Sequence, residues 1–248
     1  MIPETGKIYQ GDCLEIMRGW PDGFVDMIWT DPPYGHGNQD GDLASSRVGV
    51  KGGRQQAAVS IANDRSEDTD KVLDGFFKEA SRIMKPDCCC CCCCCMGGGG
   101  PNPTFARHAL TMDKYLKFFH AVVWDKSARG NGLGWRYRRN YEFVMVAHRK
   151  EGKLLWADED LAVPNIIRTP PVPNDDHPTQ KPLGLVLNFL KWHMLPGQIV
   201  VDPFCGSGTT LVAAEKLGLK WIGIEIDSRW SKIAQERVSA EVAQGKLF

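Results

Sequence analysis

Residues 200–210 decide the fold, and they read Val200-Val201-Asp202-Pro203-Phe204-Cys205-Gly206-Ser207-Gly208-Thr209-Thr210. The first residues predict a buried strand, and the threonine pair begins a segment with helical spacing that runs to Leu217. Between them, Gly206 and Gly208 allow a tight turn and a close approach of a ligand to the backbone. Because the N–H groups that open a helix attract polar or anionic groups, this stretch predicts a ligand-binding loop in an α/β sheet.

An acidic residue follows this loop at an informative distance. Glu225 ends the next predicted strand, 17 residues after Gly208, near the place where Rossmann-type domains carry the acid that binds ribose hydroxyls. No Gly-Lys-Ser/Thr follows, which argues against a phosphate loop, and Leu211 stands where a dehydrogenase fingerprint has its third glycine. A nucleoside ligand without a pyrophosphate fits best, and S-adenosylmethionine is such a ligand.

A second constellation lies near the N-terminus, where the apolar run 24–29 is followed by Asp31-Pro32-Pro33-Tyr34. The Asp31 carboxylate and the Pro32 carbonyl are acceptors for the hydrogens of an amine, and Tyr34 offers a ring on which a flat base could lie. The two prolines fix the backbone and remove two N–H donors. Four residues alone are equally compatible with a strand-ending turn.

Strand and helix signals alternate along the chain and predict an α/β domain with a mainly parallel sheet. The expected strands are 7–10, 24–29, 118–124, 141–147, 199–201, 221–225 and the cysteine run after 87. The expected helices are a short one from Leu14, then 70–84, 183–195, 209–217 and 228–242. Residues 118–124 and 141–147 predict a long hairpin at a sheet edge. We expect one domain over 1–248, with irregular insertions at 35–69 and 150–181.

Composition narrows the function classes. The chain has 248 residues, 43% of them hydrophobic, and a formal net charge of zero, so any nucleic-acid surface must be local. The first residues lack a secretory pattern, and no apolar window reaches the ~18 residues of a membrane span. A cytoplasmic location is therefore expected.

Eight of the ten cysteines form one run, Cys88 to Cys95, beside the glycines 97–100. Neither a disulfide framework nor a zinc site has that spacing, so no metal is expected. The run follows a predicted helix that ends near Pro86, and its position predicts a buried central strand. Its composition resembles a placeholder or an engineered replacement. Cys13 and Cys205 are expected to be reduced.

Together the two constellations resemble the amino-directed DNA methyltransferases, which methylate adenine N6 or cytosine N4. Asp-Pro-Pro-Tyr matches the catalytic motif, and Asp-Pro-Phe-x-Gly-x-Gly-Thr-Thr matches the cofactor motif. The catalytic motif comes first here, which is the permuted order of the beta group, and His177-Pro178-Thr179-Gln180-Lys181-Pro182 is a further hallmark. The resemblance covers nearly the whole chain and implies a Rossmann-like class I fold with a mostly parallel seven-stranded sheet, an antiparallel edge hairpin and circularly permuted motifs.

The resemblance also implies roles, with S-adenosylmethionine as cofactor and a bacterial or phage source. Asp31, Pro32, Pro33 and Tyr34 would be catalytic. Thr179 and Lys181 would hold the cofactor carboxylate, Glu225 the ribose hydroxyls, and Asp12 would lie near the adenine, although a helix-capping Asp is nearly as compatible. The remaining cofactor residues would be Asp202, Phe204, Gly206, Ser207, Gly208 and Thr209; core packing is the alternative for Phe204.

DNA contact is expected from local positive charge. One group follows the strand 118–124 and another follows the catalytic motif, and a solvated basic loop is the alternative for each residue. The candidates are Lys126, Arg129, Arg136, Arg138 and Arg139, with Arg47, Lys51 and Arg54.

The expected function is methyl transfer from S-adenosylmethionine to N6 of a flipped adenine in double-stranded DNA. Cytosine N4 is the first alternative, although its enzymes more often carry Ser before Pro-Pro-Tyr. An RNA or protein amine methyltransferase is disfavoured by the permuted order. An inactive, cofactor-binding and DNA-binding subunit is the alternative from another class. A homodimer and a cognate restriction endonuclease are further partners to test.

Overall fold

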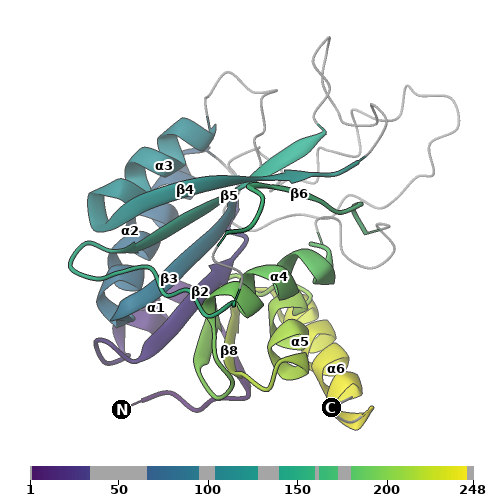
Figure 1. Cartoon of the computed structure of the whole chain (residues 1–248). Helices are drawn as coiled ribbons and strands as arrows, with labels where there is room; N and C mark the ends of the chain where they lie inside the picture. Colours follow the sequence, from purple (N-terminus) through teal and green to yellow (C-terminus); the bar gives the residue numbers. More distant parts are fainter. Residues whose placement is uncertain are drawn as a thin grey trace, which may run out of the picture.

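One sheet runs through the computed structural model, which describes residues 2–33, 66–94, 104–127, 140–159, 162–172 and 180–244. In these ranges the sheet has eight strands in the order β1-β8-β7-β2-β3-β5-β4-β6 (Figure 1). Their bounds are β1 Lys7–Gln10, β2 Val25–Thr30, β3 Met84–Cys94, β4 Leu116–Asp125, β5 Tyr141–Arg149, β6 Ile166–Arg168, β7 Ile199–Asp202 and β8 Lys220–Glu225.

The strand directions confirm the predicted fold. β1, β8, β7, β2 and β3 pair in parallel, whereas β5 is antiparallel to both β3 and β4. The hairpin of β4 and β5 was expected at the sheet edge, and the structure adds the three-residue strand β6 outside it, parallel to β4. β6 lies within the stretch 150–181 that was expected to be irregular.

Helices cover both faces of the sheet (Figure 1). On one face lie α1 Cys13–Arg18, α2 Ser66–Ile83 and α3 Thr104–Tyr115. On the other lie α4 Leu183–His193, α5 Thr209–Lys216 and α6 Ser228–Ala243. Each face has its own apolar core: α2 packs there through Leu73, Phe76 and Phe77, and α4 through Leu185 and Phe189. Within the described ranges no helix is both long and apolar enough to cross a bilayer.

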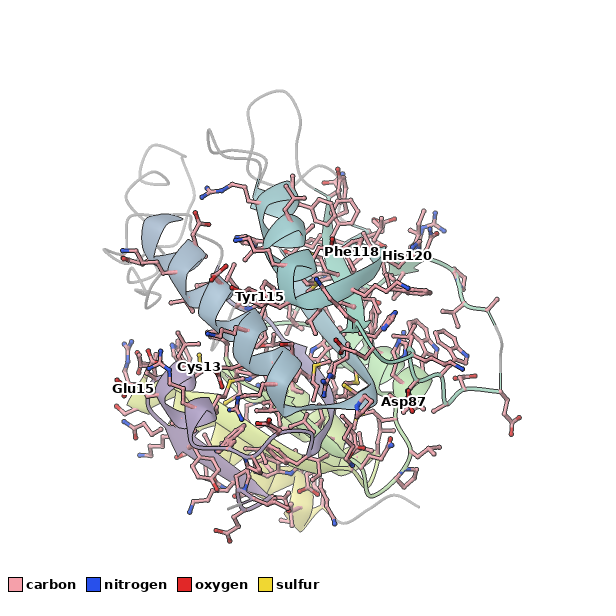
Figure 2. All side chains as sticks on the ribbon, turned by 90° about the vertical axis from the view of Figure 1, so that its left-hand side faces the viewer. Cys13, Glu15, Asp87, Tyr115, Phe118 and His120 are labelled. Atoms are coloured by element: carbon pink, nitrogen blue, oxygen red, sulfur yellow. The ribbon has the colours of Figure 1, made fainter. Side chains whose placement is uncertain are left out.

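The face formed by α1, α2 and α3 is turned to the viewer in Figure 2. Cys13 and Glu15 mark α1, and Tyr115 marks the end of α3 beside α2. The Tyr115 hydroxyl donates to Asp74 of α2 at 2.9 Å, and this hydrogen bond raises the pKa of the phenol. The sequence did not predict α3, which nevertheless fixes α2 against the sheet.

β2 is the central element, because all six of its residues are buried. Met27 and Trp29 belong to the core beneath α4 and α5, whereas Ile28 belongs to the core beneath α2. The one charged residue in the strand, Asp26, accepts from the Lys85 ammonium at 2.7 Å and from the Ile199 backbone at 2.9 Å. A strand that is apolar on both faces is what an inner parallel strand requires.

The cysteine run occupies β3, between β2 and β5, so its predicted central position is confirmed. α2 ends at Ile83 and β3 begins at Met84, so the helix ends one residue earlier than predicted. Pro86 lies in an irregular part of β3, because Val25 is opposite Met84 whereas Met27 is opposite Cys89. A proline within a sheet is tolerated at such a bulge, since no ladder hydrogen bond is lost there.

Candidate active site

The candidate residues meet at one edge of the sheet because they follow the carboxyl ends of parallel strands. β7 and β2 are neighbours, with Ile28 opposite Val201, and β7 pairs on its other side with β8. The chain leaves β2 towards β3 and leaves β7 towards β8, in opposite directions along the sheet. This divergence is the topological switch point at which open α/β sheets bind their ligands.

The predicted catalytic motif follows β2 directly at this point. Asp31 follows the last strand residue, with a side chain 20% exposed, and Pro32 is buried. The Lys181 ammonium lies 2.7 Å from Asp31 Oδ2, which is the separation of a strong charge-assisted pair. Tyr34 lies outside the described residues.

Lys181 stands in an ionic cluster that also contains Glu142 and Lys126. Its ammonium is 3.4 Å from Glu142 Oε2, and the Lys126 ammonium pairs with Glu142 Oε1. The ring of Trp124 lies 6.0 Å from the Lys181 nitrogen and 5.0 Å from the Lys126 nitrogen. A cation close to an aromatic ring gains electrostatic stabilisation, so this indole is a favourable wall for both ammonium groups.

The predicted cofactor loop joins β7 to α5. Gly208 is the N-cap residue of α5 with φ +81°, and Gly206 has φ +50°, so both adopt the left-handed conformation that favours glycine. A Cβ on Gly208 would also lie 2.9 Å from the Cβ of Ala234 on α6. Glycine at position 208 is therefore required both by the backbone and by the packing of α6 against the loop.

Glu225 ties this loop to the end of β8. Its carboxylate accepts the Gly206 N–H at 2.8 Å through Oε2 and the Asp227 N–H at 2.9 Å through Oε1. Burial raises the pKa of Glu225 above its ordinary value, against these two hydrogen bonds, which lower it. A carboxylate offers about four lone-pair sites, so acceptor capacity remains for a further donor such as a ribose hydroxyl.

Asp202 ends β7 and is enclosed by donors from three sides. Its oxygens accept from the hydroxyls of Thr30 at 2.9 Å and Thr210 at 2.5 Å, and from the Phe204 N–H at 3.1 Å. Burial raises the pKa of Asp202 to about 7 despite these bonds. Because Thr30 precedes the catalytic motif and Thr210 belongs to the first turn of α5, Asp202 connects the two predicted motifs directly.

The other predicted cofactor residues surround the same loop. Phe204 is half-buried and packs edge-on against Phe76 of α2, with ring centroids 5.5 Å apart, so core packing accounts for part of its surface. Ser207 and Thr209 are buried. Ser207 accepts from Arg237 of α6 at its carbonyl, 2.5 Å, and at its hydroxyl, 2.8 Å, and that hydroxyl lies 3.4 Å from the Gln180 side-chain oxygen.

Asp12 follows β1 at the same edge and caps α1. Its Oδ1 accepts the N–H groups of Leu14 at 2.7 Å and Glu15 at 3.2 Å, as a helix N-cap does. The capping alternative weighed from the sequence is thus realised. Both capping bonds use Oδ1, so they do not exclude a further contact of Oδ2 with the cofactor. The role of Asp12 near the adenine stays a prediction.

The DNA-contact predictions fall mostly outside the described residues, and so does Thr179 of the cofactor set. Of the basic candidates only Lys126 is described, and it pairs with the buried Glu142. The others outside the described ranges are Arg47, Lys51, Arg54, Arg129, Arg136, Arg138 and Arg139. Their contacts with DNA stay predictions.

Sequence reasoning missed three residues that the structure brings to this edge, Glu142, Trp124 and Arg237, and it quoted Gln180 only as part of a motif, without a role. Glu142 gave a weak signal, since it is an acidic residue directly before the apolar run 143–147, and the structure shows that it is only 5% exposed. Arg237 gave none, because an arginine on a surface helix is ordinary. Its pairing with Ser207 depends on how α6 packs against the loop.

Comparison with known proteins agrees with this architecture. The chain is 27% identical over 234 residues to the protein YubD of Escherichia coli (strain K12), covering 94% of this chain and 90% of that protein. It superimposes on TTHA0409 of Thermus thermophilus, solved in complex with S-adenosyl-L-methionine, with a TM-score of 0.68 and 21% identity over 95% of this chain and 94% of the other. The cytosine-N4-specific PvuII DNA methyltransferase gives a TM-score of 0.70 at 18% identity, over 98% and 93% of the two chains.

These likenesses establish the class I methyltransferase fold. A family model described as DNA methylase, for N6 and N4 methyltransferases, matches residues 25–236, which include both motifs, the ionic cluster and the loop before α5. The chain therefore belongs to the N6/N4 family of DNA methylases.

Proposed function

We propose that this protein transfers a methyl group from S-adenosylmethionine to the exocyclic N6 of an adenine in double-stranded DNA. The observation that carries the proposal is the adjacency of β2 and β7. The amine-accepting Asp31 and the glycine loop before α5 follow neighbouring strands, and Asp202 joins them through the Thr30 and Thr210 hydroxyls.

The residues at the loop fit the cofactor. Glu225 retains acceptor capacity for ribose hydroxyls after its bonds to Gly206 and Asp227, and Phe204 is only half-buried in the loop. When bound, S-adenosylmethionine would supply the activated methyl group. The Thermus protein was solved in complex with the same molecule, which supports the assignment.

The remaining chemistry belongs to the chain itself. An exocyclic base amine is a poor nucleophile because its lone pair is delocalised into the ring. Asp31 and the Pro32 carbonyl would accept hydrogen bonds from the two amine hydrogens, which favours a pyramidal nitrogen with its lone pair directed at the methyl carbon. Asp31 would take the one proton that the nitrogen loses as the nitrogen–carbon bond forms and the carbon–sulfur bond breaks. No covalent bond to the protein is needed, and the acceleration comes from orientation and electrostatics. Tyr34 would stack on a base that has left the duplex.

Adenine is proposed over cytosine because Asp rather than Ser precedes Pro-Pro-Tyr at position 31. The experiment incubates the protein with duplex DNA and labelled S-adenosylmethionine, then identifies the modified nucleoside by mass. N6-methyladenine is the expected product, whereas N4-methylcytosine would refute the choice of base and retain the reaction class.

Asp31→Ala tests the catalytic role. We expect methyl transfer to fall by at least ~100-fold, with cofactor binding retained, because a positioned proton acceptor contributes about that much. Near wild-type turnover by a folded Asp31→Ala protein would refute the role. Cofactor binding without methyl transfer by the wild-type chain would instead support the inactive-subunit alternative.

We further propose that the whole chain acts as one domain and that the segments around 35–69 and 150–181 read the DNA sequence. A second copy of the chain and a restriction endonuclease with the same target are the proposed partners. Sedimentation with and without duplex DNA tests the first of these.

A further inference from the structure

Glu142, in the ionic cluster beside the predicted catalytic motif, has no role in the proposed reaction and none implied by the sequence. Glu142 lies near the start of β5, and its side chain is 6% exposed. It is opposite Trp124 in the β4–β5 ladder, and its two oxygens face two different cations. The carboxylate is therefore held between Lys126 on one side and Lys181 on the other.

Two ammonium groups and two carboxylates alternate in this cluster, in the order Lys126, Glu142, Lys181 and Asp31. Lys181 contacts both carboxylates, at 2.7 Å from Asp31 and 3.4 Å from Glu142. A buried ammonium is costly unless it is paired, and the Lys181 side chain is only 7% exposed. Glu142 offsets that cost and, with the Trp124 ring, restricts where the ammonium can lie.

The position of Lys181 in turn constrains Asp31. A short bond from a fixed ammonium to Oδ2 restricts where the Asp31 carboxylate can lie and how far it can rotate. Methyl transfer depends on this orientation, because the amine hydrogens must meet the acceptor while the lone pair faces the methyl carbon. A displacement of about 1 Å in such an arrangement costs about 100-fold in rate.

We propose that Glu142 is a positioning residue for methyl transfer: it fixes the Lys181 ammonium, through which the Asp31 carboxylate is oriented towards the substrate amine. This inference rests on the proposed function. It also gives Lys181 a role at the catalytic motif, in place of the cofactor-carboxylate role that the sequence resemblance implies.

The two roles of Lys181 predict different kinetics for Glu142→Gln, which keeps the shape of the side chain and removes its charge. If Lys181 orients Asp31, kcat falls by about 10- to 100-fold while KM for S-adenosylmethionine stays within about twofold. If Lys181 binds the cofactor carboxylate, KM rises while kcat is retained, and the inference is refuted. Unchanged kcat and KM would refute it as well.

The control is Glu241→Gln, which removes a partner of Lys216 in a half-buried pair between α5 and α6. Lys216 ends α5, whereas the candidate site lies at its beginning, so we expect unchanged kcat. Glu142→Asp keeps the charge on a shorter side chain and should recover part of the kcat lost in Glu142→Gln. Circular dichroism and thermal unfolding verify that each variant is folded.

If Glu142→Gln does not fold, Glu142→Asp takes its place: reduced kcat with unchanged KM supports the inference, and wild-type kcat refutes it. The wild-type chain is measured in the same assay. Failure of the wild type to methylate DNA would refute the proposed function and this inference together. An active wild type with an equally active Glu142→Gln protein would refute the inference alone.

Discussion

Asp202 makes the stability of the fold depend on pH in a direction that is unusual for an aspartate. Burial raises its pKa from 3.8 to about 7 in the folded state. The protonated carboxyl is therefore favoured by folding, and the stability that this contributes is present at low pH and lost as the pH rises towards 7. A salt-bridged aspartate, with a lowered pKa, would behave in the opposite way.

The size of this change in the free energy of unfolding follows from the interval between the unfolded and folded pKa values of Asp202. Each pH unit between the unfolded and folded pKa values corresponds to about 1.4 kcal/mol. Between pH 5 and pH 8 the free energy of unfolding should then fall by about 3 kcal/mol on account of Asp202 alone. Above pH 8 this contribution no longer changes.

Asp202→Asn isolates the effect because an amide does not titrate, whereas Glu225 and the other groups titrate in both proteins. Denaturant unfolding of both proteins at pH 5, 6, 7 and 8 gives their stability difference at each pH. We expect the advantage of the wild type to shrink by about 3 kcal/mol from pH 5 to pH 8. A difference that stays constant within ~0.5 kcal/mol would show that Asp202 is ionised throughout and would refute the reasoning.

Two further predictions concern packing at the predicted cofactor loop and a polar contact at the opposite edge of the sheet. Gly208→Ala should destabilise the fold by about 1–3 kcal/mol more than Gly197→Ala. Both glycines have a positive φ, +81° and +83°, but only a Cβ at Gly208 would meet Ala234. Thermal unfolding compares the two variants, and equal losses of stability would contradict the packing argument. Arg82→Met should cost about 1–2 kcal/mol, because the Arg82 guanidinium donates to the Met17 carbonyl of α1 at 2.8 Å and to the Trp20 carbonyl of the following turn at 2.7 Å. Arg229→Met, which removes an exposed pair, should leave the unfolding midpoint nearly unchanged, and a comparable loss in both variants would refute the distinction.

Local patterns were sufficient to predict the core of the fold. The inner strands β2, β7 and β8 are short apolar runs that end in an acidic or hydroxyl residue, so their position and direction could be predicted from adjacent residues. α3 and β6 were missed for different reasons. α3 follows a stretch of glycines and prolines that resembles a linker, and β6 has three residues, too few for a periodic signal.

The candidate site could be predicted only where a residue lies in a motif. Asp31 and Glu225 were found because each lies at the end of a predicted strand. Glu142 and Arg237 were not, because their importance depends on partners far along the chain, Lys181 and Ser207. Such pairings follow from the order of strands in the sheet and from the packing of α6, which single-sequence patterns do not specify.

The pairing of β2 with β7 also has a consequence for how the protein is made. Ile28 and Val201 are partners in one ladder although they are far apart in the sequence, so this contact has a large loop-closure cost. During synthesis from the N-terminus, β2 emerges long before the strand that covers one of its sides. The apolar strand β2 therefore lacks one of its two neighbouring strands while the chain is still on the ribosome. The two halves of the site can meet only after α4 and β7 have been translated. Nascent chains should consequently be most prone to aggregation in that interval, and a stalled chain that ends before β7 would carry Asp31 without its cofactor loop.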